Sequence, residues 1–128
     1  MKKYNITSIL GIIGMVTWTI TIFLRELSLT NINISFILGI MPNISATWLF
    51  IWMGEIIVNR KNIHFNFKVA SITSGLIFLF AIISEIIHDI FLNSSFDIYD
   101  IIATLVSIII YLVFFYFTEN TLKISEQH

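Results

Sequence analysis

Four long apolar runs, separated by short polar segments, divide the chain. They extend over about residues 5–24, 36–58, 67–92 and 98–118. Each run is close to or above the roughly 20 residues that a helix needs to cross a bilayer. Because the connecting segments are short, consecutive helices must be antiparallel neighbours. The pattern predicts an all-α fold, in which residues 1–128 form a single antiparallel bundle of four transmembrane helices.

Pro42 interrupts the second apolar run, at Gly39-Ile-Met-Pro42-Asn43. Proline removes a helix hydrogen-bond donor and clashes with the preceding turn. One interpretation is a single kinked span that begins near Phe36. The other is a re-entrant or interfacial stretch over residues 34–43, followed by a shorter span. Both interpretations predict that the second helix is broken or kinked near Pro42.

The composition excludes several classes of protein. The apolar fraction is 57% and the charged fraction is 12%, whereas soluble domains have about 25% charged residues. A soluble enzyme, a disordered tail and a nucleic-acid binder are therefore all excluded, and lipids are the expected surroundings. The sequence contains no cysteine, which excludes disulfides and thiolate sites. The first run follows Lys2 and Lys3 as a signal peptide would, but it is too long and lacks an Ala-x-Ala-like site, so it predicts a retained helix.

The basic residues predict the orientation of the bundle. With the N-terminus inside, the cytoplasmic segments contain Lys2, Lys3, Arg60, Lys61, Lys68 and Lys123, and the external side contains Arg25. Cytoplasmic segments of membrane proteins carry such an excess of basic residues. Both termini are therefore expected to be cytoplasmic.

Most acidic residues collect on the opposite, external side: Glu26, Glu85, Asp89, Asp97 and Asp100. Glu85 is the most unusual, because it lies seven residues inside the third helix, roughly 10 Å from its end. Glu85, His88 and Asp89 have the spacing of one helix face. An ionisable residue at such a depth indicates a functional site. The predicted external-side pocket contains Glu85, His88, Asp89, Asp97, Asp100, Thr104, Arg25 and Asn43.

Simpler interpretations exist for some of these residues. Asp97 has the position of an N-cap of the fourth helix, with Asp100 at the third helical position. Glu55 is interpreted as a headgroup-level residue near Arg60. A group of carboxylates needs protons, basic side chains or a bound cation nearby. One histidine without a ligand pattern indicates no particular metal, so the metal is left unknown and no cofactor is predicted.

Two segments, Ala81–Phe91 and Phe96–Thr104, resemble the VanZ-like family of small bacterial membrane proteins. Glu85, Asp97, Asp100 and Ala103 match the family pattern, while His88 stands where glutamine is usual and Thr104 where asparagine is usual. The resemblance implies a multi-pass protein of the bacterial inner membrane and cell envelope. It also implies a link to resistance against teicoplanin, a glycopeptide antibiotic, and it brings no established chemistry.

Three functions follow as hypotheses. In the first, the external pocket binds a cation or a lipid-linked envelope component. In the second, the protein is a small proton-coupled transporter that uses Glu85. In the third, it is a non-catalytic subunit or assembly partner, as a homo-oligomer or with another membrane protein. No residue set indicates a reaction type, so an enzyme is not favoured.

Overall fold

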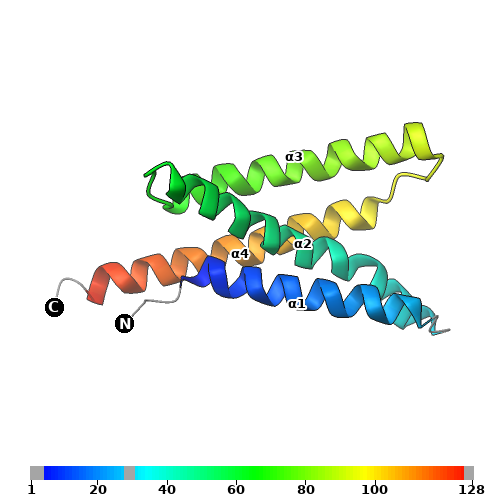
Figure 1. Ribbon diagram of the computed structural model, residues 1–128, viewed down its shortest axis with the longest axis horizontal. Coiled ribbons are helices and arrows are strands. Elements are labelled where there is room, and N and C mark those ends of the chain that lie inside the picture. Colours follow the sequence, from blue (N-terminus) through cyan, green and yellow to red (C-terminus); the bar gives the residue numbers. More distant parts are fainter. Residues whose placement is uncertain (1–4, 28–30, 126–128) are drawn as a thin grey trace.

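The computed structural model describes residues 5–27 and 31–125, and the described chain forms four helices (Figure 1). They are α1 (Ile6–Glu26), α2 (Ile32–Arg60), α3 (Phe67–Leu92) and α4 (Ile98–Ser125). Three asparagines, Asn5, Asn31 and Asn66, cap the starts of the first three helices, each by accepting backbone N–H groups of the first turn. The predicted all-α fold is confirmed.

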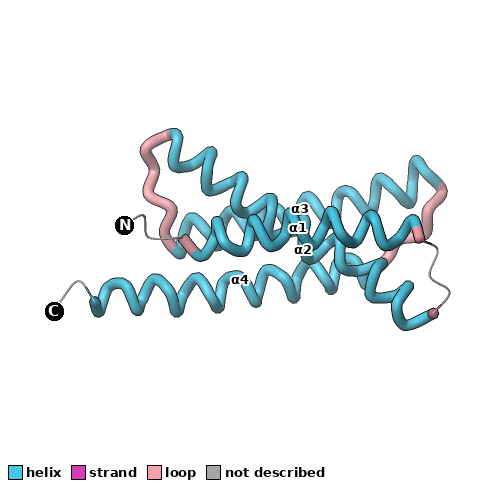
Figure 2. The backbone as a smooth tube through the Cα atoms, turned by 60° about the horizontal axis from the view of Figure 1, so that its bottom comes forward, coloured by secondary structure: helices cyan, strands magenta, loops and turns pink. Residues whose placement is uncertain are grey.

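The helices run up and down, and the connections lie at the two ends of the bundle (Figure 2). The start of α1, the end of α2, the start of α3 and the end of α4 share one end, which we call the basic end because Arg60, Lys61, Lys68 and Lys123 lie on these segments. The other end carries Glu26, Glu85, Asp89, Asp97 and Asp100, and we call it the acidic end.

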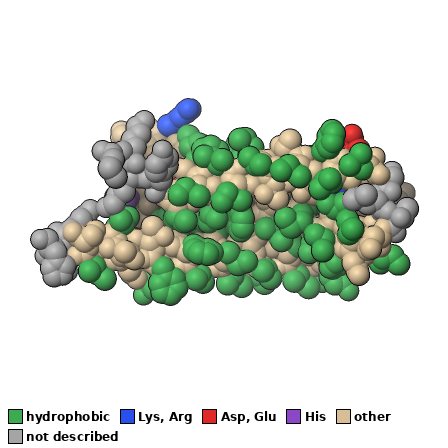
Figure 3. Space-filling view, turned by 90° about the horizontal axis from the view of Figure 1, so that it is seen from below, with side chains coloured by type: hydrophobic (Ala, Val, Ile, Leu, Met, Phe, Trp, Pro, Cys, Tyr) green, Lys and Arg blue, Asp and Glu red, His purple; other side chains and the backbone are tan. Residues whose placement is uncertain are grey.

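The outer surface of the bundle is apolar between its two ends (Figure 3). Large apolar side chains on all four helices are exposed, among them Ile20, Phe50, Phe80 and Phe114. All four helices are long and apolar enough to cross a membrane. This surface and these lengths suit a multi-pass membrane protein whose exposed side chains contact lipid.

The helix α2 is longer than the sequence predicts. It begins at Ile32 and continues as one helix of 29 residues through Pro42, so the interpretation with two separate segments is wrong. Side-chain hydroxyls bond to backbone carbonyls beside the proline: Ser45 donates to Met41 at 2.6 Å and Thr47 donates to Asn43 at 2.6 Å. Hydroxyl groups and neighbouring helices allow apolar helices to continue through a proline.

Two glycines let α1 lie directly against α2. Gly11 and Gly14 are both buried. A Cβ atom on Gly14 would lie 2.5 Å from the backbone oxygen of Ser45, and one on Gly11 would lie 2.5 Å from Cβ of Trp52. Small residues at this spacing permit the close backbone approach on which helix association in lipid depends.

The buried core lies towards the basic end. Its members come from the first half of α1, the second half of α2, the α2–α3 connection, the start of α3 and the second half of α4: Leu10, Ile51, Phe65, Ala70, Tyr111 and Phe115. On α3 the buried residues are Ala70 and Ser74, both in its first half. The second half of α3 is thus only loosely packed, and α3 stands apart from α2 towards the acidic end (Figure 1).

The last helix is longer than the sequence predicts. The helix α4 continues to Ser125, beyond the predicted limit near residue 118. Lys123 and Glu119 are one turn apart on it and form a partly exposed ion pair of 3.3 Å, a spacing that supports a helix. Lys2, Lys3 and the last three residues lie outside the described chain.

Candidate functional site

A small polar cavity lies at the acidic end, between α2, α3 and α4. It has a volume of about 50 Å³. The residues that line it are Asn43, Ala81, Ser84, Glu85, Asp100, Ile101 and Thr104, and we call it the acidic pocket. Four of the eight residues predicted for the external site therefore meet here, from three different helices.

Glu85 is held in place by contacts on both α3 and α4. Its side chain is 14% exposed and lies 3.9 Å from Nδ1 of His88, one turn later on α3. Its other oxygen accepts the backbone N–H of Asp97 at 3.3 Å. That N–H belongs to the start of α4, where the helix dipole favours a negative charge. Glu85 therefore links the end of α3 to the start of α4.

Asp97 has a structural role as the N-cap of α4. Its side chain accepts the backbone N–H of Tyr99 at 2.9 Å, and Asp100 is the acidic residue of the first turn. On the other side of the loop, Asn93 ends α3 in the left-handed conformation with φ of 49°, which asparagine adopts more readily than most residues. The simpler interpretation of Asp97 is confirmed, and the two caps fix the short turn that brings α3 and α4 together.

Two substitutions of Asp97 distinguish the stabilising effect of its N-cap from that of its negative charge. We expect Asp97→Ala to lower the free energy of unfolding by about 1 kcal/mol, because the first turn of α4 loses its side-chain acceptor. Asp97→Asn keeps that acceptor, so it should change stability by only a few tenths of a kcal/mol. Unfolding by dodecyl sulfate in mixed micelles measures both. An Asn variant as unstable as the Ala variant would show that the charge of Asp97, and not its cap, stabilises the bundle.

Asp100 interacts electrostatically with both the acidic and the basic side chains of the acidic end. Its carboxylate interacts unfavourably with those of Asp97 and Glu85, and favourably with Arg25 and His88. Thr104 is buried one turn below and donates its hydroxyl to the Asp100 carbonyl oxygen at 2.9 Å. Three carboxylates thus face two basic groups, one of which is a histidine. This arrangement favours a further positive charge in the pocket.

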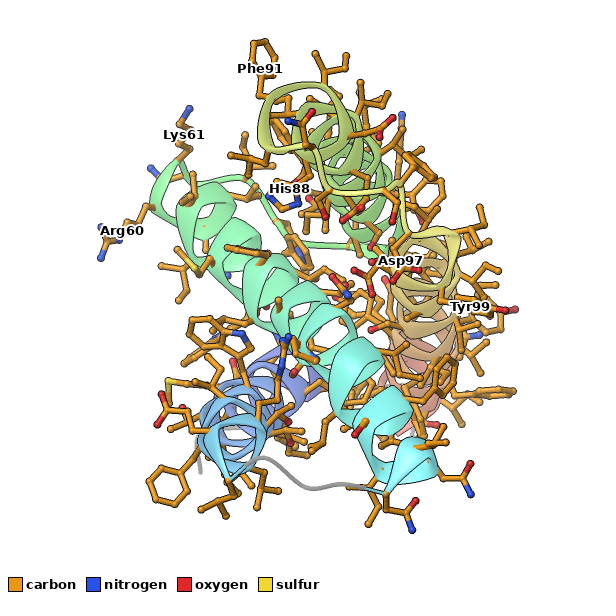
Figure 4. The ribbon with its side chains drawn as sticks, turned by 90° about the vertical axis from the view of Figure 1, so that its right-hand side faces the viewer. Arg60, Lys61, His88, Phe91, Asp97 and Tyr99 are labelled. Carbon is orange, nitrogen blue, oxygen red and sulfur yellow. The ribbon has the colours of Figure 1, made fainter. Side chains whose placement is uncertain are left out.

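The remaining predicted residues lie at the rim or outside. His88 is half exposed and Arg25 is exposed in the last turn of α1. His88 and Asp97 lie on the inner side of the bundle in the end-on view, whereas Phe91 points away from it (Figure 4). Asp89 is exposed and does not line the pocket. Asp89 has the spacing of the same α3 face as Glu85, but it lies one turn beyond the pocket, which neither it nor His88 lines.

A much larger apolar groove separates α2 from α3 and adjoins the acidic pocket. Its volume is about 650 Å³, within the range of small-molecule sites. Small side chains face each other across it, among them Ala46 and Thr47 on α2 and Ala81 and Ser84 on α3. Phe50 and Phe80 also line it and are themselves exposed, so the groove opens sideways onto the apolar surface.

The groove and the pocket are continuous. Asn43, Ala81, Ser84 and Thr104 line both of them. The groove extends along α2 from Asn43 to Ile57, a length of roughly 20 Å at the rise of an α-helix. The helices approach closely at Gly54, where an added Cβ would lie 2.7 Å from Cγ2 of Thr73. Sequence reasoning did not predict the groove, because it depends on how far α3 diverges from α2.

The structure also corrects the interpretation of Glu55. It is 3% exposed and accepts a hydrogen bond from the side chain of Asn5, so it is buried between helices instead of being an exposed residue beside Arg60. The signal in the sequence was its position inside an apolar run with no basic residue one turn away. Within the described ranges, no group of three His, Cys, Asp or Glu side chains is close enough to hold a metal ion.

Comparison with known proteins adds no assignment. No protein-family model matches the chain, and neither the curated proteins nor the solved structures include a significant match.

Proposed function

We propose that this protein binds an amphiphile with a primary ammonium head group, whose apolar tail occupies the groove between α2 and α3. The supporting observation is the continuity of the two cavities through Asn43, Ala81, Ser84 and Thr104. An apolar groove that ends in a pocket with carboxylates is complementary to a molecule with one apolar end and one cationic end.

The size of the acidic pocket and the charge of its side chains limit which head groups can bind there. The small volume of the acidic pocket, about 50 Å³, suits a compact head group such as an ammonium group. Glu85 and Asp100 would repel a phosphate. A lipid-linked envelope component would therefore be recognised through an amino group. A free hydrophobic amine carries the same ammonium group and would be recognised in the same way.

The proposed setting is the bacterial inner membrane, with the acidic end outside. The basic end contains Arg60, Lys61, Lys68 and Lys123, and the start of α1 and the end of α4 lie there. The excess of basic residues on cytoplasmic segments then supports cytoplasmic termini. The VanZ-like resemblance and the link to glycopeptide resistance stay predictions from sequence, as does a role as an assembly partner, and the binding proposal does not depend on them.

Dodecylamine and dodecyl sulfate test the proposal, because they share a tail and differ in head-group charge. We expect dodecylamine to bind the protein in dodecyl maltoside micelles and dodecyl sulfate to bind at least tenfold more weakly. The double variant Glu85→Gln, Asp100→Asn should lose at least tenfold in dodecylamine affinity, since hydrogen bonds to charged groups contribute about 1.5–3 kcal/mol each. Native mass spectrometry counts the bound probes.

Asp89→Asn is the matched control, because Asp89 lies on the same helix but outside the pocket. Its dodecylamine affinity should equal that of the wild type. The proposal is overturned if the double variant keeps its affinity, or if Asp89→Asn loses as much, since binding would then depend on the general surface charge. Dodecyltrimethylammonium, with a bulkier head, should bind more weakly than dodecylamine.

A further inference from the structure

A second polar cluster lies at the opposite end of the bundle from the acidic pocket. It joins three helices and contains Asn5, Thr7, Glu55 and Tyr111. The side-chain amide of Asn5 donates to a carboxyl oxygen of Glu55. The hydroxyls of Thr7 and Tyr111 form a hydrogen bond of 2.9 Å. Thr7 and Tyr111 are completely buried and Glu55 is 3% exposed.

Local structure explains how Asn5 reaches Glu55. Asn5 is the N-cap of α1, and its side-chain oxygen accepts the backbone N–H of Thr7 at 3.3 Å. This bond directs the amide nitrogen of the same side chain away from α1 and towards α2. The cap therefore serves two purposes, because it starts α1 and it supplies a donor to the buried carboxyl group.

Within the described residues, no basic side chain forms an ion pair with Glu55. On α4 the ionisable group near Glu55 is Tyr111, which carries no positive charge, and α1 carries its charged residues, Arg25 and Glu26, at the far end. On α3, Lys68 is exposed. At the end of α2, Arg60 and the following Lys61 are exposed and point away from the bundle (Figure 4). Neither of the two ion pairs found in the described ranges includes Glu55.

We propose that Glu55 is a proton-binding site, a neutral carboxylic acid held by Asn5 between α1, α2 and α4. A buried carboxylate without a cation is far more costly than a buried acid. The neutral acid keeps a carbonyl oxygen that accepts the Asn5 amide. The ligand of this site is thus a proton, and the site is separate from the acidic pocket and independent of any amphiphile.

The proton exchanges at the basic end. Towards the acidic end, the buried face of α4 is polar, but its hydroxyls are committed as donors: Thr104 to the Asp100 carbonyl at 2.9 Å and Ser107 to the Ile44 carbonyl at 3.0 Å. Hydroxyls that donate to carbonyls do not form a chain that passes protons along the helix. Asn5, in contrast, is exposed, so the hydrogen-bond partner of the Glu55 carboxyl group is accessible from the start of α1.

Infrared spectroscopy tests the site directly, because the C=O stretch of a protonated carboxylic acid is distinct from the bands of a carboxylate. At pH 7, well above the ordinary carboxyl range near 4, the wild-type protein in dodecyl maltoside should show this band, and it should shift in D2O. Glu55→Gln should remove the contribution of Glu55 to this band, whereas Glu119→Gln should leave the band unchanged. Glu119 is the control at the same end, since it is paired with Lys123.

Stability provides a second readout. The folded protein holds a proton that the unfolded chain releases, so wild-type stability should fall as the pH rises through neutrality. In Glu55→Gln this decrease should be absent, because the amide binds no proton. A wild-type spectrum at pH 7 with no protonated-acid band overturns the proposal whether or not Glu55→Gln folds. A band of undiminished intensity in the folded Glu55→Gln variant also overturns it.

Discussion

Gly14→Leu should disrupt the bundle more than any other single substitution considered for this chain. A Cβ atom at Gly14 would lie 2.5 Å from the backbone oxygen of Ser45 and 3.3 Å from the backbone nitrogen of Leu49. Backbone atoms cannot rotate away as side chains do, so α1 and α2 must separate. Overpacking costs about 1–3 kcal/mol in a typical core, and we expect the upper end or more here, since packing provides most of the association energy of helices in lipid.

Gly39→Leu and Gly75→Leu are the matched controls for this substitution. No atom lies within 4 Å of a Cβ built at either position, so neither variant should lose stability. Unfolding by dodecyl sulfate in mixed micelles compares all three with the wild type. Equal loss in the controls would mean that the bulk of leucine, and not the α1–α2 contact, causes the effect. Gly75 also shows that spacing alone misleads, because Ser71 and Gly75 have the spacing of a packing pair but Gly75 is exposed.

Ala81→Trp should abolish dodecylamine binding and leave the fold intact. Ala81 lines both the apolar groove and the acidic pocket, so a large side chain there obstructs the passage between them. Trp buries a large apolar surface, and it would do so in a groove of about 650 Å³. We expect at least a tenfold loss of affinity with an unchanged or higher thermal midpoint, because filling a cavity commonly adds about 0.5–2 kcal/mol of stability.

Leu79→Trp is the control on the same helix, since Leu79 is 52% exposed and lines neither cavity. It should bind dodecylamine like the wild type. If Ala81→Trp lowers the affinity for dodecylamine without lowering the thermal midpoint, the substitution has blocked the site and has not damaged the fold. Undiminished binding in Ala81→Trp would place the amphiphile elsewhere on the apolar surface and would contradict the proposed function.

These expectations share one structural cause, the unequal packing of the two ends. At the basic end, Phe65 and Phe115 meet edge to face with ring centroids 6.0 Å apart, and Tyr111 packs against Phe115. At the acidic end, the second half of α3 has no buried residue. Tight packing at one end gives the bundle its stability, and the divergence of α3 at the other end leaves room for a ligand.

Local signals determined much of the candidate site. The Asp97 cap followed from the position of the residue before an apolar run, and the link between Glu85 and the start of α4 followed from a short connection. Glu55 was misread for a physical reason. Its depth along α2 could be counted from the sequence, but the contact that buries it depends on Asn5, which is 50 residues away in the chain. Sequence spacing describes faces of single helices, not the neighbours of those faces.

The sequence by itself determined four long apolar helices, their antiparallel order and the separation of basic from acidic residues, because bilayer thickness and the rarity of charge in lipid act on each helix separately. Only the tertiary structure decided which charged residues are buried and where a cavity lies. Helices that are apolar nearly all round can pack in many rotations, and close contacts such as that of Gly14 with Ser45 select one of them. That selection places Glu55 inside the bundle, leaves Asp89 outside it, and opens the groove that leads to Glu85 and Asp100.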